Sequence, residues 1–87
     1  MYRNNLQIIS DLLTHTEQEI KTTHLLHKTN LSYSRLTKFI KNLTGAGLII
    51  KIEHDGRNTF VITEKGRQYL ESYKQFYKLT ESFGLEL

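Results

Sequence analysis

Residues 22–46 constrain the fold of this chain most, because they predict two helices joined by only three residues, "NLS" at positions 30–32. Asn30 readily adopts the left-handed conformation that ends a helix, and the hydroxyl of Ser32 can cap the next one. So short a connection makes the two helices one helix-turn-helix unit. The second helix has apolar residues three and four positions apart on one side, namely Leu36, Phe39, Ile40 and Leu43.

The outer face of that second helix carries positive charge only. It presents Ser34, Lys38 and Lys41, flanked by Arg35, Thr37 and Asn42. Between Glu19 and Glu53 the chain has several Lys and Arg but no Asp or Glu. A basic stretch without acids suits a polyanionic partner, because each Lys or Arg near a phosphate can release a condensed counterion. This distribution carries more weight than the modest formal charge of +3.

Helices are also expected before and after this unit. Residues 4–13 predict a first helix, with a buried stripe of Leu6, Ile9, Leu12 and Leu13, and with Ile8 beside it. In the short helix over residues 22–29 and just before it, Ile20, Leu25 and Leu26 are expected to point inward. A last helix begins after Thr63, and its length of about 20 residues, or ~30 Å, exceeds what a core this small can cover.

Residues 48–63 predict a β-hairpin. Leu48, Ile50 and Ile52 alternate with Ile49, Lys51 and Glu53, which is the period of a strand. The pair Asp55–Gly56 favours a tight hairpin turn, and residues 59–63 are β-branched and aromatic enough to form the returning strand. Gly45 or Gly47 can end the helix that precedes the hairpin.

The predicted order of elements is therefore helix, helix, turn, helix, hairpin and long helix. This order predicts a fold that is mainly α with a small β-hairpin (α+β), namely a winged helix-turn-helix with a long C-terminal helix. Residues 1–63 are expected to form a winged helix-turn-helix DNA-binding domain. Residues 64–87 are expected to form a C-terminal dimerisation helix.

Two segments carry a resemblance to a known family. "LLHKTNLSYSRLTKFIKNLTGAGLI" and "FVITEKGRQYL" resemble the small archaeal winged-helix DNA-binding proteins, including the crenarchaeal chromatin-type dimers. With the hairpin between them they cover about half of the chain. The resemblance implies binding of double-stranded DNA by a homodimer whose C-terminal helices form an antiparallel coiled coil. Thr44, Gly45 and Ala46 depart from it, since charged residues usually end the recognition helix of such proteins.

The recognition helix is expected over residues 32–46, inserted in the major groove, where its N-terminal residues would meet base edges. Ser34, Arg35 and Lys38 would lie deepest, and the planar guanidinium of Arg35 can donate two hydrogen bonds to guanine. Ser32, Tyr33 and Lys41 are expected to contact the DNA backbone. For Tyr33, packing against the preceding helix is an equal alternative.

Two further groups of residues are candidates for phosphate contacts. Lys21, Thr22 and Thr23 stand at the start of the short helix, where backbone N–H groups and the helix dipole favour an anion. Arg57 and Asn58 follow the hairpin turn of a wing expected over residues 48–63, where they could reach an adjacent minor groove or phosphate. Since His54 and Asp55 lie beside them, a solvated turn without DNA contact is the alternative.

The last helix carries an aromatic stripe that predicts a partner helix. Its members follow steps of four and three, or lie alongside, and comprise Tyr69, Leu70, Tyr73, Phe76, Tyr77, Thr80 and Phe83. The first turns can pack on the first helix of the same chain. Beyond Tyr73 little of the domain is left to cover the stripe, so a second copy of the chain is the expected partner.

Other classes of function find no support in the residues. The chain has no Cys, and His24 and His27 share a helix face without a third metal ligand at a recognisable spacing, so surface histidines are favoured over a metal site. Phosphate-binding glycine loops, nucleophile motifs and paired catalytic carboxylates are absent, so we expect no enzyme and no cofactor. No segment suits a signal peptide or a membrane-spanning helix, and no small-molecule ligand is evident. A cytoplasmic, nucleoid-associated protein is expected.

The functional prediction is a sequence-specific, homodimeric transcriptional regulator that binds double-stranded DNA. An architectural, chromatin-type DNA-binding role is the nearest alternative, and an all-lysine face would favour it. A winged-helix module for protein–protein interaction is the alternative from another class, and an exposed apolar patch on the recognition helix would favour that.

Overall fold

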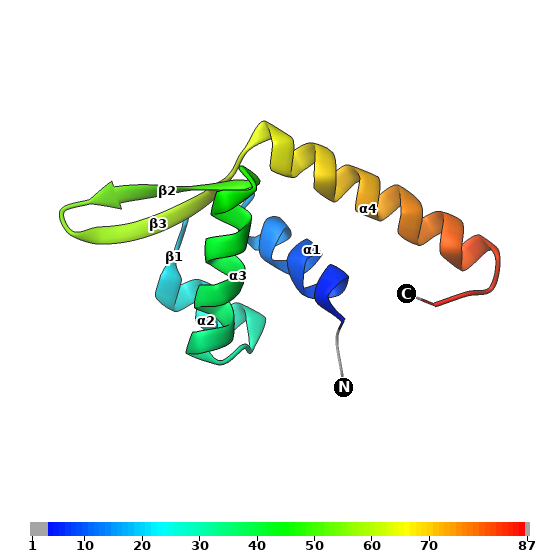
Figure 1. Ribbon diagram of the computed structural model, residues 1–87, viewed down its shortest axis with the longest axis horizontal. Helices are drawn as coiled ribbons and strands as arrows, with labels where there is room; N and C mark the ends of the chain where they lie inside the picture. The colour runs from blue at the N-terminus through cyan, green and yellow to red at the C-terminus, as the bar shows by residue number, and fades with distance from the viewer. Residues whose placement is uncertain (1–3, 87) are drawn as a thin grey trace.

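The computed structural model describes residues 4–86, and Figure 1 shows their arrangement. Along the chain the elements are α1 (Asn5–His15), β1 (Ile20–Lys21), α2 (Thr22–Thr29), α3 (Tyr33–Gly45), β2 (Ile49–His54), β3 (Arg57–Ile62) and α4 (Glu64–Ser82). The predicted order of helices and hairpin is confirmed. The strand β1 is an addition, because two residues are too few to show a strand period in the sequence.

Helix boundaries follow the capping residues. The side chain of Ser32 accepts a hydrogen bond from the Arg35 N–H (3.3 Å), and Thr63 Oγ1 accepts one from the Gly66 N–H (3.0 Å). Asn30 ends α2 in the left-handed conformation, with φ of 55°. All three predicted caps are confirmed. Asn4 caps α1, with its side chain accepting from a backbone N–H in the first turn.

The sheet is antiparallel, with β3 between β1 and β2. Ile20 pairs with Phe60 in this sheet, so Ile20 lies in the strand β1 and not in a loop that leads into α2. Alternation along β2 is confirmed, and its two faces differ: Ile49 is buried in the core, whereas Ile50 is 50% exposed on the other face. Asp55 and Gly56 both have positive φ, which a two-residue hairpin turn requires.

The core lies between α1 and the helix-turn-helix unit. Leu12, Leu13, Leu25 and Leu36 are almost completely buried there. For α1 the predicted stripe needs a correction, because Ile8 is buried and Leu6 is 41% exposed. Leu6 lies on the same side of α1 as Leu13 but two turns nearer the N-terminus, where the end of the helix passes the edge of the core. Ile9 is partly buried against the core.

The wing and α4 project from this core in opposite directions, which gives the molecule its longest extent of 49 Å (Figure 1). The first turns of α4 pack on the domain. Leu70 is a buried core residue and Tyr69 is packed against the core, so these two members of the predicted dimerisation stripe serve their own chain. Thr80, near the other end, is 8% exposed.

Gly66 permits the close approach of α4 to the start of the wing. A Cβ at this position would collide with the carbonyl oxygen of Leu48 and would lie 2.7 Å from Cγ1 of Ile62. The backbone of Leu48 cannot rotate away from an added Cβ as a flexible side chain could. The absence of a side chain at Gly66 therefore sets how tightly α4 joins the sheet.

We expect Gly66→Ala to lower the free energy of unfolding by about 1–3 kcal/mol, because the added methyl group overpacks against fixed backbone. Gly45→Ala is the matched control, since no atom lies within 4 Å of its Cβ position and alanine favours a helix. Urea denaturation of both variants measures the difference. Equal midpoints for the two variants would contradict the packing argument.

Candidate nucleic-acid interface

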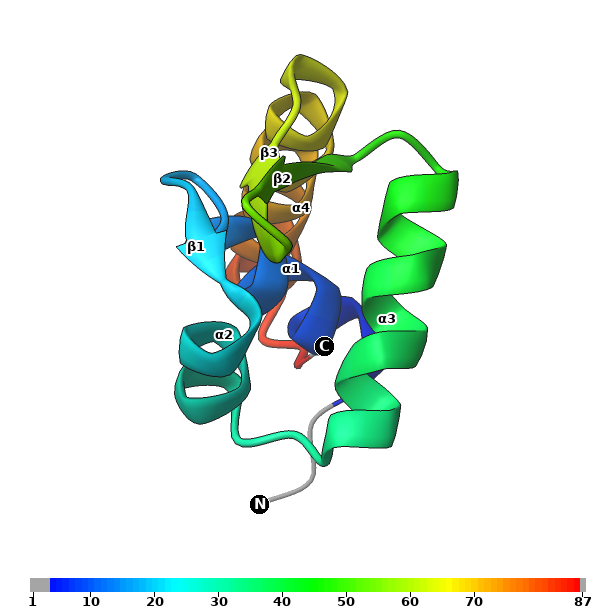
Figure 2. The ribbon, with the colours of Figure 1, turned by 90° about the vertical axis from the view of Figure 1, so that its left-hand side faces the viewer.

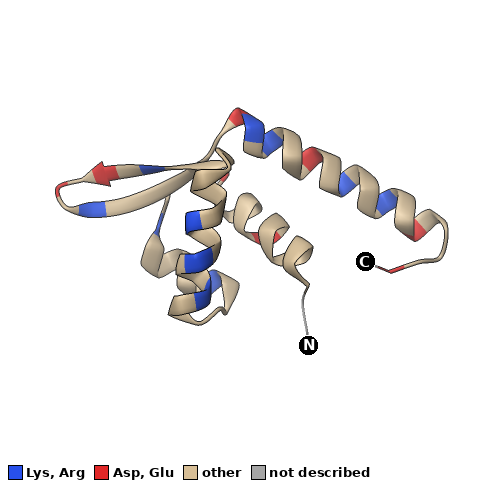
Figure 3. Cartoon of the chain, in the orientation of Figure 1, with Lys and Arg blue, Asp and Glu red and all other residues tan. Residues whose placement is uncertain are grey.

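The exposed face of α3 is basic from its first turn to Lys41, and its last turn carries no charge. Leu36, Ile40 and Leu43 are buried, and the opposite side of the helix presents Ser34, Lys38 and Lys41, all exposed. In the cartoon of Figure 3, the charged residues of α2 and α3 are all basic, whereas α4 mixes both signs. The helix α3 stands beside the wing, as the view along the wing in Figure 2 shows. The residues of the predicted one-signed helix face are therefore exposed to solvent.

Arg35 lies at the edge of that face and not at its centre. Its guanidinium carbon is 5.9 Å from the centre of the Phe39 ring, a cation–π contact. Together with Lys38 and Asn42, it lines a hollow toward Asn5 at the start of α1. The centre of the α3 face belongs instead to Ser34, Lys38 and Lys41.

Tyr33 is 66% exposed, so most of its surface lies outside the core, and its contact with the DNA backbone stays a prediction. Its side chain lines a groove between α3 and the sheet, which we name the α3–wing groove. One wall of this groove is on α3, the other is on the two long strands, and its lining includes Tyr33, Thr37, Ile40, Lys41, Thr44, Ile49, Ile50, Lys51, Asn58 and Phe60.

Lys51 is a basic residue of this groove that sequence reasoning left out of the candidate site. It pairs with Phe60 across the hairpin, and Asn58 is two residues from Phe60, so all three side chains share the face of the sheet toward α3. Strand alternation could have found Lys51, because it places this residue on the same face as buried Ile49. Glu53 pairs with Asn58 and adds a negative charge near the tip of that face.

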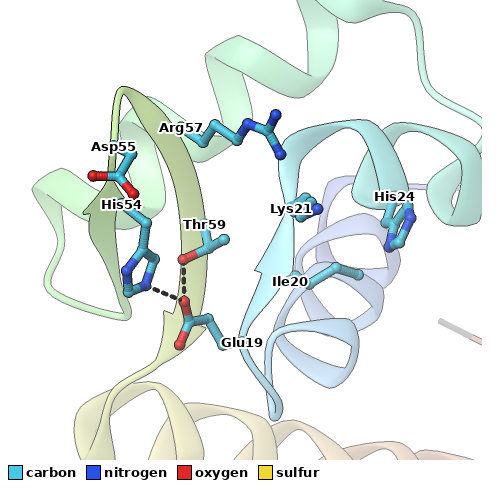
Figure 4. Close-up of a pocket in the computed structure, with 8 residues that line it drawn as sticks. All are labelled: Glu19, Ile20, Lys21, His24, His54, Asp55, Arg57 and Thr59. Carbon is cyan, nitrogen blue, oxygen red and sulfur yellow. Dashed lines mark hydrogen bonds and ion pairs between the residues drawn. The ribbon is translucent and has the colours of Figure 1, made fainter.

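The predicted wing residues Arg57 and Asn58 lie on opposite faces of the hairpin. Asn58 lines the α3–wing groove, whereas Arg57 lines a separate hollow on the β1 side of the wing. Figure 4 shows this β1-side hollow, into which Lys21 and His24 also project. Neighbouring residues of a strand point to opposite faces, so one hairpin offers polar side chains to two different surfaces.

The start of α2 has the features expected of a phosphate contact. Lys21 occupies the N-cap position without a side-chain hydrogen bond to the first turn, and no acidic residue lies in that turn. Lys21 and Thr23 are exposed, whereas Thr22 is partly buried and lines the α3–wing groove. Backbone N–H groups of a first helical turn lack partners within the helix and can bind an anion.

A carboxylate joins the wing to the loop after α1. Oε2 of Glu19 accepts hydrogen bonds from Thr59 Oγ1 (2.5 Å) and from His54 Nε2 (2.8 Å). Both bonds favour the charged carboxylate, the Thr59 hydroxyl more than His54, and they hold the pKa of Glu19 below its usual range. Sequence reasoning missed this contact because its partners are 35 and 40 residues apart.

Metal and membrane sites find no support in the described part of the chain. Over residues 4–86, no group of three or more His, Cys, Asp or Glu side chains could hold a metal ion. His24 and His27 are both exposed. Within the same residues, no helix is long and apolar enough to cross a membrane.

The sequence profile of the winged helix-turn-helix family matches residues 2–81, nearly the whole chain. The chain belongs to this family. The predicted fold class and the resemblance are thereby confirmed, and members of this family bind DNA and are not enzymes. A comparison with curated proteins found no match.

Solved structures of similar fold include Sso10a-2, a DNA-binding protein from Sulfolobus solfataricus. It has a TM-score of 0.84 and 23% sequence identity over 93% of this chain and 85% of its own. The transcriptional regulator BldR from the same organism has a TM-score of 0.73 and 23% identity over 79% of this chain and 52% of BldR. F93 from STIV, a winged-helix DNA-binding protein, has a TM-score of 0.72 and 21% identity over 90% of this chain and 92% of F93. The chain thus shares the fold of known winged-helix regulators.

The Glu19 contact predicts a pH dependence of stability. Because the pKa of Glu19 is lowered in the folded state, its contribution is complete above the unfolded pKa and is lost as the pH falls through the folded pKa. We expect the stability advantage of the wild type over Glu19→Gln to shrink as the pH falls from about 5 to about 3. Urea denaturation at a series of pH values measures it. A pH-independent difference would contradict the link.

Proposed function

We propose that this chain is a homodimeric transcriptional regulator that binds specific sequences of double-stranded DNA. The observation that carries the proposal is the acid-free, exposed face of α3, which stands beside a wing of the same chain. In winged helix-turn-helix proteins such a helix enters the major groove. Among residues 4–86, α3 itself carries no acidic side chain that could neutralise this face, and a phosphate backbone would.

In the proposed complex, Ser34 and Lys38 near the start of α3 face the base edges, and Lys41 and Ser32 reach phosphates. Arg35 approaches the DNA from the α1 side of the helix. Its guanidinium would move away from the Phe39 ring and donate two parallel hydrogen bonds to guanine. Since residues 44–46 are uncharged, base readout is confined to the first turns of α3.

In the proposed complex, the wing and α2 contact phosphates on either side of α3. Lys21, Thr22 and Thr23 bring the N-terminal turn of α2 to one backbone, and Tyr33 stands next to it. On the wing, Lys51 and Asn58 extend the basic surface of the α3–wing groove. Arg57 faces the β1-side hollow, so it would meet a different phosphate or the adjacent minor groove.

The distal half of α4 is the proposed dimer interface. Phe76, Tyr77 and Phe83, three members of the predicted stripe, are exposed, and Tyr73 is partly exposed with its ring 6.2 Å from that of Tyr77. Leu79 and Leu85 are also exposed and extend the apolar surface beyond the predicted set. Burial of one large apolar side chain contributes ~1.5–3 kcal/mol, so a few of them can support a dimer.

An architectural role is the second candidate, because the cations at the centre of the interface are lysines: Lys38, Lys41 and Lys51. Lysine binds phosphates as a point charge, but it reads the base sequence less well than arginine does. Selection of bound sites from random duplex DNA distinguishes the two. Enrichment of one motif supports a regulator, whereas binding without enrichment supports an architectural protein in the nucleoid. Absence of binding to any duplex at low salt would overturn both.

Two substitutions on α3 should have different effects on duplex binding. Lys41→Ala is expected to weaken binding to all duplexes alike and to lower the slope of log affinity against log salt by about 1. Arg35→Ala is expected to relax sequence preference, with a loss of ~1–3 kcal/mol of discrimination at one base pair. Fluorescence anisotropy on the selected site and a scrambled duplex measures both. Uniform weakening by Arg35→Ala would reassign this residue to phosphate binding.

For the dimer, Phe76→Glu is expected to raise the dimer dissociation constant by about a hundredfold or more, since the symmetric interface would lose two apolar side chains. Gln75→Glu is the matched control, because Gln75 lies on the polar side of α4 with Arg67 and Glu71. Sedimentation equilibrium measures both constants. A wild-type chain that remains a monomer at micromolar concentration would refute the dimer.

A further inference from the structure

The wing needs support from outside the hairpin. The strand β1 pairs with β3 only at Ile20–Phe60 and Lys21–Thr59. Beyond Thr59, toward the tip, the hairpin is a ribbon of two strands. Such a ribbon is only marginally stable in water when nothing packs on it. The position of the wing tip therefore depends on contacts made at or beyond Thr59.

Glu19 makes contacts of this kind with both strands. Its Oε2 binds Thr59 on β3 and His54 at the end of β2, so one atom joins the hairpin to the loop that follows α1 (Figure 4). Thr59 is 8% exposed although it lies on the outer face of the sheet. We propose that Glu19 is a positioning residue for the wing in duplex binding, and that His54 makes this positioning depend on pH.

The chemistry of the link gives the direction of the pH effect. Glu19 stays charged across the neutral range, because its two hydrogen bonds favour the carboxylate. Histidine is the side chain that ordinarily changes charge between pH 5 and pH 8. A neutral ring donates one ordinary hydrogen bond from Nε2, whereas a protonated ring donates a stronger, charge-assisted one. Protonation of the His54 ring therefore tightens the link.

Other charged groups face the same β1-side hollow and define the controls. Lys21 comes from β1, His24 from α2, Asp55 from the wing turn and Arg57 from the start of β3. Arg57 pairs with His54 across the hairpin, and Asp55 follows His54 in the chain. Since His24 is a second histidine that lines this hollow, the contribution of His54 must be measured against a His24→Gln variant.

The first measurement needs no DNA. Protection of the backbone amides of residues 52–59 against hydrogen exchange is measured by NMR at pH 6 and pH 8 in the wild type, Glu19→Gln, His54→Gln and the double variant. We expect Glu19→Gln to lower wing protection several-fold while amides of α1 and α3 keep theirs. Thr59→Val should act like Glu19→Gln, and Thr59→Ser, which keeps the hydroxyl, should not. Unchanged wing protection in Glu19→Gln would overturn the proposal.

The second measurement rests on the proposed function and uses a fixed duplex. Between pH 8 and pH 6, the gain in duplex affinity is expected to be about two- to fivefold larger for the wild type than for His54→Gln. We call this difference the pH excess. Glu19→Gln should lose this pH excess, and the double variant should lose no more of it than Glu19→Gln alone. His24→Gln should retain the pH excess. If Glu19→Gln keeps the whole pH excess, His54 acts on DNA without Glu19, and the proposal is wrong. If the wild type binds no duplex at all, the proposed function fails, whereas the exchange measurement still decides the positioning role.

Discussion

The helix α3, the wing and α4 are joined by one set of hydrogen bonds around Thr63. Thr63 Oγ1 donates a hydrogen bond to the Gly47 carbonyl oxygen (2.6 Å) and accepts one from the Gly66 N–H (3.0 Å). The Thr63 N–H donates to the Leu48 carbonyl oxygen (3.0 Å). Because these bonds join the end of α3, the start of β2 and the start of α4, they fix the direction of the wing and of α4 together. The spacing between the proposed DNA-binding surface and the proposed dimer interface therefore depends on this junction.

Local signals in the sequence were sufficient for most of the fold. Asn30, Ser32 and Thr63 act through atoms at most three residues away, so their roles as helix ends could be predicted from residue type and position. The Asp55–Gly56 turn is equally local, because the two residues alone supply the positive φ values that it needs. Periodicity also identified the basic face of α3, since a helix side is defined by spacing along one segment.

Tertiary contacts account for what could not be predicted. Leu6 and Leu13 share a side of α1, and only the surrounding structure decides that Leu13 is buried and Leu6 is exposed. The Glu19–Thr59 hydrogen bond spans 40 residues, and a glutamate in a polar loop gives no sign of such a partner. The division of Arg57 and Asn58 between two surfaces was within reach of strand alternation, but the location of those surfaces depends on how α2 and α3 flank the sheet.

The contrast between α3 and α4 is an internal argument for a polyanionic partner. On α4, Arg67 stands four residues before Glu71, and Lys78 stands three before Glu81, so opposite charges lie next to each other. On α3, Arg35, Lys38 and Lys41 follow one another at steps of three with no acid between them, and such neighbours repel. Folding gains nothing from this arrangement. The same chain builds an ordinary solvated surface on α4, so the run of like charges on α3 supports the proposed binding to phosphates.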